Sequence, residues 1–261
     1  MRPVRHTLVT MTRSDAHKIA EWVEHHTRLG FEDFQVVLDG DVDGTGRILD
    51  ELDRELPARI TVHRRDEVGE YYDDLPVAER HERVRAWRER HAEALASGEM
   101  RGVDPLSWRQ HRHVAEVMAP YAAGRHGGGW LAFFDVDEFL VLREHRTVGE
   151  LVEGVTTRRL RFRSFDVDTT GHDPARPVLE QHTHRWAWED LVAHPQQRWA
   201  NRVKSMVRYR AAVLGSTVHK ISRGPHQVVD WETARLHHFK VPPSTDLRIP
   251  YRVDDPVRPL S

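Results

Sequence analysis

The sequence predicts an α/β fold with parallel strands, on three observations. Strand-like and helix-like segments alternate within about the first 60 residues, the helix-like segments are apolar on one face only, and turn-forming residues separate them. Such alternation gives parallel strands joined by right-handed crossovers. Ligands of these sheets bind beyond the carboxyl ends of the strands. We therefore expect functional residues in the turns that follow the strands.

The first predicted strand covers residues 6–12, HTLVTMT, which are apolar and β-branched. A helix with one buried face follows the strand. Its apolar residues recur at the spacing i, i+3, i+4 and i+7 and are Ala16, Ile19, Ala20 and Val23. Ser14 is the expected N-cap of this helix, and Gly30 is expected to end it.

The second predicted strand is the short apolar run FQVVL at 34–38, and the acidic turn DGDVDGT follows it. A second helix is expected after the turn, with one apolar stripe made of Ile48, Leu49, Leu52 and Leu56. The segment ARITVH at 58–63 alternates as a third strand. Two acidic or polar turns, SDAHK and DGDVDGT, are thereby expected at the ligand-binding edge.

The rest of the chain gives a coarser prediction. Residues from about 65 to 100 are charge-dense and mostly helical, and another helix is expected at 107–122. Thr147 and Glu150 form a capping box for a short helix. LRFRSF at 160–165 alternates as a strand. The segments VLEQHTHRW, KSMVRYRAAV and STVHKIS are expected as strands or extended chain, and the proline-rich last twenty residues as a surface tail.

Composition excludes several classes of protein. The chain of 261 residues contains no cysteine, so disulfides, thiolate metal sites and cysteine nucleophiles are excluded. Its net charge of −2 argues against nucleic acid as a partner. No apolar run approaches the ~20 residues of a membrane span, and the first residues do not form a secretory signal. We expect a cytoplasmic protein.

The stretch WLAFFDVDEFL at 130–140 runs from an apolar strand into three acids. Asp135 and Asp137 lie two residues apart, so they point to the same side if the strand continues through them. Such a pair suits Mg²⁺ or Mn²⁺, whose open positions phosphate oxygens can fill. The alternative is a structural role, in which the acids cap a helix or pair with Arg143.

Residues from about 8 to 240 resemble the glycosyltransferase 2-like enzymes of GT-A fold, in the branch that is similar to glycosyltransferase family 92. The resemblance rests on three blocks in order along the chain. The first is EWVEHHTRLGF with VVLDGDVDGT, and the second is WLAFFDVDEFLVL. The third is the succession VLEQHTHR, KSMVR, VHK and LHHF. The resemblance implies a mixed, mostly parallel sheet flanked by helices.

The resemblance also implies a domain organisation. A single GT-A domain is expected over residues 1–240, followed by a C-terminal tail at 241–261. Within the domain, residues 1–125 would form the nucleotide-binding half and residues 126–240 the half that holds the metal and the acceptor. The oligomeric state is left open.

The resemblance assigns roles to individual residues. Asp135 and Asp137 would bind Mn²⁺ or Mg²⁺, with Asp137 as the direct ligand, and a late histidine would complete the metal shell, with His219 and His238 as candidates. The nucleotide sugar, of UDP or GDP type, would be bound by Thr12, Arg13, Asp15, Asp39 and Asp43, with Lys204 on a phosphate. Relatives have Lys/Arg-Asn-Glu where this chain has Arg13-Ser14-Asp15, so the identity of the nucleotide stays open.

The implied activity is sugar transfer from a nucleotide-diphosphate donor to a glycan or small-molecule acceptor. The catalytic base is unassigned, and its candidates are Asp168, Glu180, Glu189 and Asp190. Trp186, Trp188 and Trp199 are candidates for stacking on an acceptor sugar, although core packing is the more frequent use of tryptophan. Two alternatives remain: a non-catalytic nucleotide-sugar or carbohydrate binder of the same fold, and a phosphatase of the haloacid-dehalogenase type, which also uses Asp-x-Asp.

Overall fold

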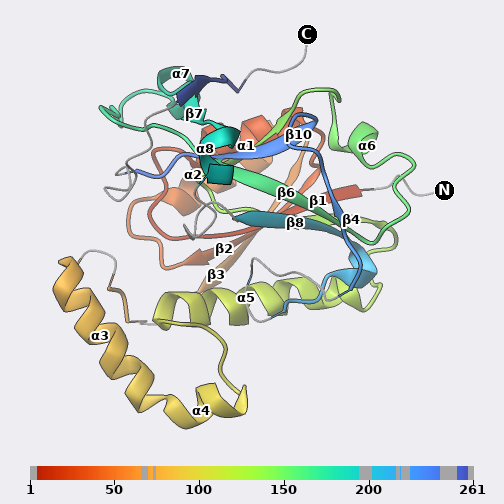
Figure 1. The fold of residues 1–261 in the computed structure, drawn as a ribbon. Coiled ribbons are helices and arrows are strands. Elements are labelled where there is room, and N and C mark those ends of the chain that lie inside the picture. Colours follow the sequence, from red (N-terminus) through yellow and green to blue (C-terminus); the bar gives the residue numbers. More distant parts are fainter. Residues whose placement is uncertain are drawn as a thin grey trace.

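A central sheet organises the computed structural model, which describes residues 5–65, 70–72, 75–193, 202–215, 218, 224–241 and 252–257. The strand order is β3-β2-β1-β4-β8-β6-β10-β5, with β9 paired to β6 (Figure 1). The strands are β1 (Arg5–Thr12), β2 (Asp33–Asp39), β3 (Arg59–Arg65), β4 (Gly129–Phe133), β5 (Glu138–Leu142), β6 (Arg159–Asp166), β8 (Val203–Arg208), β9 (Gln227–Val228) and β10 (Ala234–His238). A separate pair joins β7 (His184–Trp186) to β11 (Arg252–Asp254).

Helices lie on both faces of the sheet. Their bounds are α1 (Ile19–Arg28), α2 (Thr45–Glu55), α3 (Val77–Arg90), α4 (Ala92–Ser97), α5 (Pro105–Ala122), α6 (Val148–Leu151), α7 (Val178–Gln181) and α8 (Trp188–Ala193), with a 3-10 turn η2 (Tyr209–Ala211). Figure 1 shows α5 beneath the sheet and α3 and α4 projecting away from it. The predicted α/β architecture, a mixed and mostly parallel sheet flanked by helices, is confirmed.

Two apolar cores sit on the two faces because neighbouring strand residues point in opposite directions. Leu8 of β1 packs with α1 and α2, through Trp22 and Leu49, in the first core. Val9, one residue further along β1, packs with Val117 of α5 in the second core. The continuous apolar strands of the sequence are therefore buried on both sides, as parallel strands are.

The four strands β3, β2, β1 and β4 are all parallel, so their carboxyl ends meet at one edge. Thr12 ends β1, Asp39 ends β2, and Phe133 ends β4 two residues before Asp135. The second half of the sheet is mixed, since β8 runs antiparallel to both β4 and β6. We use the term catalytic edge for the carboxyl ends of β1, β2 and β4.

At the catalytic edge one local prediction was wrong, and the condition under which Asp135 and Asp137 would point to the same side is not met. The first helix begins at Ile19 and not near Ser14, because residues 15–18 form a turn in which Ile19 N donates to Asp15 O at 2.9 Å. The strand before the acids does not continue through them: β4 ends at Phe133, and Glu138 N donates to Asp135 O at 2.9 Å across a turn. Asp135 and Asp137 therefore lie on a strand–turn–strand connection.

Two other segments also differ from the prediction. VLEQ of VLEQHTHRW forms the one-turn helix α7, and only the following residues become a strand, β7. Most of STVHKIS lies outside the described residues. The short helix after Thr147 is confirmed as α6, where Glu150 N donates to Thr147 Oγ1 at 3.2 Å. Across the part of the chain that is described, no helix is both long and apolar enough to cross a membrane.

Candidate functional site

The turn after β1 and the turn after β2 bind each other. Thr12 Oγ1 donates to Asp15 at 2.5 Å, and Asp15 N donates to Thr45 Oγ1 at 3.1 Å. Asp43 accepts from Ala16 N at 2.9 Å and from Thr45 Oγ1 at 2.6 Å. Three of the predicted nucleotide-binding residues, Thr12, Asp15 and Asp43, are thereby held in one hydrogen-bonded unit at the catalytic edge.

Asp39, the last residue of β2, is buried and paired with a buried arginine that sequence reasoning missed. Arg109 of α5 lies with Nε at 3.0 Å from Asp39 Oδ2. The ring of Tyr71 carries the guanidinium of Arg13 at 3.3 Å and that of Arg109 at 4.3 Å, and its hydroxyl donates to Asp39 O. Two cations that contact one aromatic ring, next to a carboxylate, are therefore present where the base and ribose of a nucleotide are expected.

The acids that follow β4 meet a buried lysine. Lys204 Nζ of β8 is 2.6 Å from Asp135 Oδ2 and 2.8 Å from Glu138 Oε2, and Lys204 is only 2% exposed. Glu138 also accepts from Asp135 N at 3.0 Å. Burial raises the pKa of Glu138 to about 7, against the opposing charge of Lys204. Lys204, predicted on a phosphate, thus lies between the two carboxylates, and Arg143 instead lies near Asp255.

Asp137 has a different set of partners. Its Oδ2 lies 3.2 Å from His238 Nε2, and the other ring nitrogen of His238 is 2.6 Å from Asp166 Oδ1. Arg202 donates to Asp166 at 3.1 Å. Burial alone would raise the pKa of Asp137, but His238 holds it far below the ordinary range. Asp137 is thus a carboxylate in a chain of alternating charges at the catalytic edge.

The Oδ1 atom of Asp137 tests whether the site fits a divalent cation. This atom is buried and has no hydrogen-bond partner among the described residues. A buried oxygen without a partner calls for an explanation, and the binding of an ion is one of the usual ones. Oxygen and imidazole are ligands that Mn²⁺ accepts. The donor set of Asp137 and His238 therefore fits the predicted metal, although the described residues contain no cluster of three or more acidic or histidine side chains arranged to hold it.

Lys18 is a second cation at this edge that the sequence did not single out. It follows the turn after β1, and its Nζ is 3.0 Å from Asp15 Oδ1. Burial alone would lower the pKa of Lys18, but the carboxylates of Asp15, Asp137 and Asp135 raise it. The signal was present in the SDAHK turn, which the sheet topology placed at the ligand-binding edge. Lys18 thereby connects the nucleotide side of the site with the acids after β4.

The EWVEHH block of α1 packs behind the turn at residues 135–138, which we call the acidic turn from here on. Trp22 Nε1 donates to Glu138 O at 2.9 Å, and the His25 ring bonds Leu140 O at 2.8 Å. His26 accepts from Leu140 N at 3.3 Å. The three side chains are buried against β5, the strand that leaves the acidic turn. His25 and His26 are therefore packing residues that hydrogen-bond to the backbone of β5.

The structure separates the late histidines. His238 faces Asp137, whereas His237 lies 3.2 Å from Asp255 on the other side of β10. His219 lies outside the described residues, as does Trp199. Trp186 is buried with Phe165, and Trp188 stacks on Trp231 at 5.9 Å.

The four base candidates lie after β6, on α7 and on α8. Asp168 is partly buried and accepts from Thr170 in a turn after β6. Glu180 and Glu189 are exposed on α7 and α8. Asp190 is a residue of α8 whose side chain is not described. The assignment of a base among these four stays a prediction.

Comparison with known families gives one match. Residues 125–258 match the model of a family described as glycosyltransferase family 92. The matched part begins just before β4 and includes Asp135, Asp137, Lys204 and His238. A comparison with curated proteins found no match.

Three solved structures show a limited similarity to this chain, each with a TM-score below 0.5. S. aureus TarS is 10% identical with a TM-score of 0.47, over 92% of this chain and 37% of that one. The mannosyltransferase Ktr4p from S. cerevisiae is 12% identical with a TM-score of 0.30, over 61% and 39%. Mouse xyloside xylosyltransferase 1 is 11% identical with a TM-score of 0.35, over 78% and 67%. The chain thus spans well under half the length of the first two.

Proposed function

Because the chain belongs to glycosyltransferase family 92, we propose that it transfers a glycosyl group from a nucleotide-diphosphate sugar to an acceptor, with Mn²⁺ or Mg²⁺. The observation that carries this proposal is the buried, unpartnered Oδ1 of Asp137 beside His238, at the edge where β1, β2 and β4 end. The match is to a glycosyltransferase family, so it gives no support to the phosphatase alternative.

Asp137 and His238 would hold the metal, with Asp135 next to them on the same turn. A bound divalent cation neutralises the negative charge that develops on the leaving diphosphate. Lys18 supplies a further positive charge on the other side of the acids, as its raised pKa shows that it stays protonated at neutral pH. Lys204 keeps Asp135 and Glu138 in place and limits their mutual repulsion.

The nucleotide would lie over the ends of β1 and β2. Arg13 and Arg109, which both lie against Tyr71, supply positive charge for the phosphates, and Asp39 and Asp43 supply acceptors for ribose or base groups. The donor is expected to be of UDP or GDP type. The acceptor, a glycan or a small molecule, would approach from the side of Asp168 and Trp188, where a carboxylate can serve as a base if the reaction inverts.

A second candidate function has one observation in its favour. Lys204 already compensates Asp135 at 2.6 Å, so part of the negative charge is neutralised without a metal. A protein that binds nucleotide sugars without turning them over would keep the same fold and the same edge. Turnover, and not affinity, separates the two functions. The cytoplasmic location stays a prediction in either case.

An assay of donor turnover tests the proposal. A panel of UDP- and GDP-sugars is incubated with the protein in Mn²⁺, in Mg²⁺ and in a chelator, and release of the nucleotide diphosphate is followed by hydrolysis or by transfer to added acceptors. We expect release from one nucleotide class, only with metal. Asp137→Asn should reduce the rate by about 10²-fold or more, since it removes a group that acts in the transition state.

The matched control is Asp50→Asn, which makes the same change of charge at an exposed position of α2. It should leave the rate unchanged. Nucleotide binding without release from any donor in the panel would instead favour the non-catalytic binder.

A further inference from the structure

Three adjoining cavities run from the amino-terminal edge of the sheet along the flank of η2. Their volumes are about 700, 270 and 800 Å³. The first and second share Gly127, Gly128 and Tyr209, and the second and third share Arg158, Arg210 and Ala211. Because neighbouring cavities share lining residues, we treat the three as one surface and call it the arginine groove.

Most guanidinium groups that line the arginine groove are not paired with a carboxylate of a described residue; Arg65 is the exception, because it pairs with Glu116. Arg5, Arg59 and Arg125 line its first cavity, Arg158, Arg208 and Arg210 its second, and Arg101 the far end of its third. All seven are exposed, and none has a carboxylate within ion-pair distance among the residues with described positions. Those with a hydrogen bond use backbone carbonyls: Arg208 donates to Val155 O and Arg101 to Gly215 O.

The two carboxylates that line the arginine groove are already satisfied. Asp33 is buried and accepts from Tyr121 at 2.7 Å and from Thr7 at 3.0 Å. Glu116 is paired with Arg65 at 3.2 Å. The groove therefore carries a strong positive charge on a chain whose net charge is −2, and this segregation of charge attracts anionic partners.

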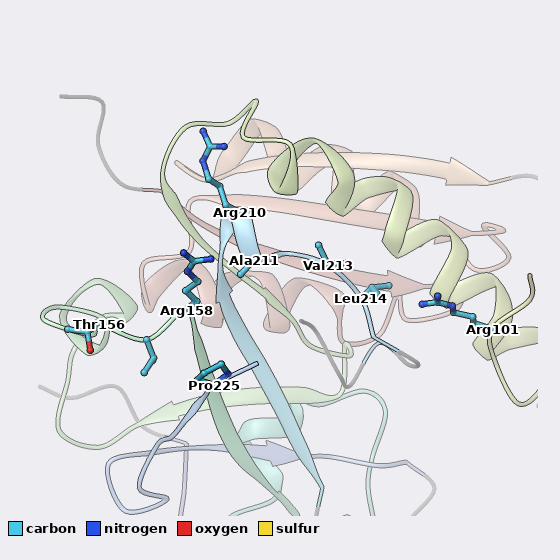
Figure 2. Close-up of a pocket in the computed structure, with 9 residues that line it drawn as sticks. Arg101, Thr156, Arg158, Arg210, Ala211, Val213, Leu214 and Pro225 are labelled. Carbon is cyan, nitrogen blue, oxygen red and sulfur yellow. The ribbon is translucent and has the colours of Figure 1, made fainter. Parts of the chain in front are cut away.

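The middle of the arginine groove is open because its wall is built of glycine. A Cβ at Gly127 or Gly128 would meet no atom within 4 Å, so these residues leave space beside the arginines. Gly124 has a φ of +75°, and the Arg210 guanidinium lies against it where a Cβ would be 2.7 Å away. Figure 2 shows Arg158 and Arg210 at one end of the third cavity and Arg101 at the other.

Most of the arginine groove lies away from the catalytic edge. Arg5 and Thr12 are the two ends of β1, and seven residue steps of a strand span roughly 23 Å. Arg65, which also lines the first cavity, ends β3 in register with Asp39. The groove therefore reaches the catalytic edge at this end, while its second and third cavities are lined by none of the residues assigned to the nucleotide or to the cation. An extended chain is long enough to reach both places.

We propose that the arginine groove binds an anionic glycan, whose carboxylate or phosphate groups pair with the guanidinium groups, and that it thereby holds a polymeric acceptor while the end of the chain reacts at the catalytic edge. Guanidinium groups bind both anions in a bidentate manner. This acceptor assignment rests on the proposed glycosyl transfer. The existence of the binding groove does not.

The shape of the groove favours a glycan over a membrane or a nucleic acid. A concave, linked series of cavities fits a flexible chain, whereas a membrane surface would need a flat or protruding basic face. Single-stranded nucleic acid is bound by stacking on aromatic rings as well as by charge. The two tyrosines that line the groove, Tyr121 and Tyr209, are each 2% exposed and offer no ring face to a base.

Fluorescence anisotropy with labelled oligogalacturonate, a carboxylated glycan, tests the proposal on the full chain. We expect saturable binding that weakens as salt is raised, and no binding of neutral dextran of the same length. The double variant Arg158→Glu/Arg210→Glu should weaken binding by about tenfold or more, since it reverses the charge where two cavities overlap. A labelled oligonucleotide of equal charge and anionic vesicles should bind at least about tenfold more weakly than the glycan.

The matched control is Arg85→Glu/Arg176→Glu, which makes the same change of charge at exposed positions away from the groove. It should leave glycan affinity within about twofold. Equal effects of the two double variants would overturn the assignment of the groove, and equal binding of the oligonucleotide or the vesicles would overturn the assignment to a glycan. Melting temperatures of both variants establish that they fold.

The failure of this inference is distinguishable from failure of the proposed function. The groove variant should keep the metal-dependent release of nucleotide from the donor, because its substitutions lie away from Asp137 and Asp39. Donor turnover without glycan binding contradicts the groove alone. Glycan binding without donor turnover contradicts the transferase and leaves a glycan-binding protein.

Discussion

Asp135 and Asp137 lie on one turn, two residues apart, and have different chemical surroundings. Asp135 pairs with Lys204, and Gln110 donates to its other oxygen at 3.3 Å. Asp137 faces His238 and keeps one buried oxygen without a partner in the described part of the chain. This difference gives a physical reason to prefer Asp137 as the direct metal ligand, where the sequence alone offered only the resemblance.

Lys204→Met is expected to destabilise the fold strongly. The substitution leaves buried Glu138 without its cation at 2.8 Å, and an uncompensated buried charge costs about 3–5 kcal/mol. Urea unfolding followed by tryptophan fluorescence measures the loss. Glu138→Gln added to Lys204→Met should recover part of the stability, because it removes the buried charge. Wild-type stability of the single variant would show that the ion pair is not structural.

Protonation of His25 is expected to weaken the fold in acid. Burial lowers the pKa of His25 to about 4 from about 6.5, so the folded state binds its proton less readily than the unfolded state. The stabilisation is therefore complete above pH 6.5 and is lost as the pH falls toward 4. The free energy of unfolding that is lost between these two pH values is on the order of 3 kcal/mol.

The comparison of wild type with His25→Gln measures this effect. Glutamine can still donate to Leu140 O, where the histidine ring bonds at 2.8 Å, but it does not titrate. The free energy of unfolding of the variant should therefore fall less between pH 7.5 and pH 5 than that of the wild type. His81→Gln, at an exposed position of α3, serves as the control and should titrate like the wild type. Parallel pH profiles for His25→Gln and wild type would refute the expectation.

At the scale of elements, long-range strand register brings the site together. His238 meets Asp166 because β10 and β6 are parallel neighbours with these residues in register. Lys204 reaches the acids because β8 lies between β4 and β6. Trp22, His25 and His26 of α1 hydrogen-bond to the backbone of β5 and so hold the strand that follows the acidic turn.

Asp255→Ala is expected to release β11 from β7. Asp255 is buried and accepts from Arg185 of β7 and Arg235 of β10, so its loss leaves two buried guanidinium groups unpaired. The cost should be about 3–5 kcal/mol. Hydrogen exchange of the β7 amides should accelerate in this variant. Asp254→Ala removes the neighbouring, exposed carboxylate and should not change exchange; equal acceleration in both variants would contradict the role of Asp255.

The apolar runs along the sequence predicted the parallel half of the fold, because each of its strands is encoded by one short continuous segment. The apolar runs at 6–12, 34–38 and 58–63 correspond to β1, β2 and β3 within one or two residues at each end. The start of α1 was mispredicted because Asp15 is used in the turn that binds Thr12 and Lys18. Thr45 and Asp43 of the turn after β2 also accept from the amides of Asp15 and Ala16, so tertiary contacts overrode the capping signal of Ser14.

The site was predictable only where its residues lie beside a strand end. Thr12, Asp39 and Asp135 follow from the topology, since parallel strands bring their carboxyl ends together. Arg109 and Asp166 do not, because their positions depend on how α5 packs and on the register of β6 with β10. No spacing along the sequence encodes either contact.

At the scale of the whole molecule, one sheet presents two charged edges. The catalytic edge gathers Asp39, Asp135 and Asp137, and the opposite end of β1 opens into the arginine groove. We propose that residues 1–240 act as a single domain, with nucleotide contacts before residue 125 and the metal after it. The family match over residues 125–258 covers the second of these halves and extends beyond residue 240.

Ligand binding should raise the stability of the whole chain. A ligand at 100 times its Kd stabilises the folded state by about 2.7 kcal/mol, and a domain of this size gains roughly 2–4 °C in Tm per kcal/mol. Mn²⁺ together with the correct nucleotide diphosphate should therefore raise the Tm by roughly 5–10 °C in differential scanning fluorimetry. Each component alone should give a smaller shift, and an equal shift with metal chelated would indicate a metal-independent site.

The central claim is that the acids after β4 hold a cation that in turn binds a diphosphate. Isothermal titration calorimetry of UDP and of GDP, with and without Mn²⁺, into wild type, Asp137→Ala and the control Asp50→Asn tests it most directly. The account predicts that one nucleotide binds wild type and the control only with Mn²⁺, and that Asp137→Ala abolishes this binding. Absence of binding for both nucleotides, or equal affinity in Asp137→Ala, would contradict it.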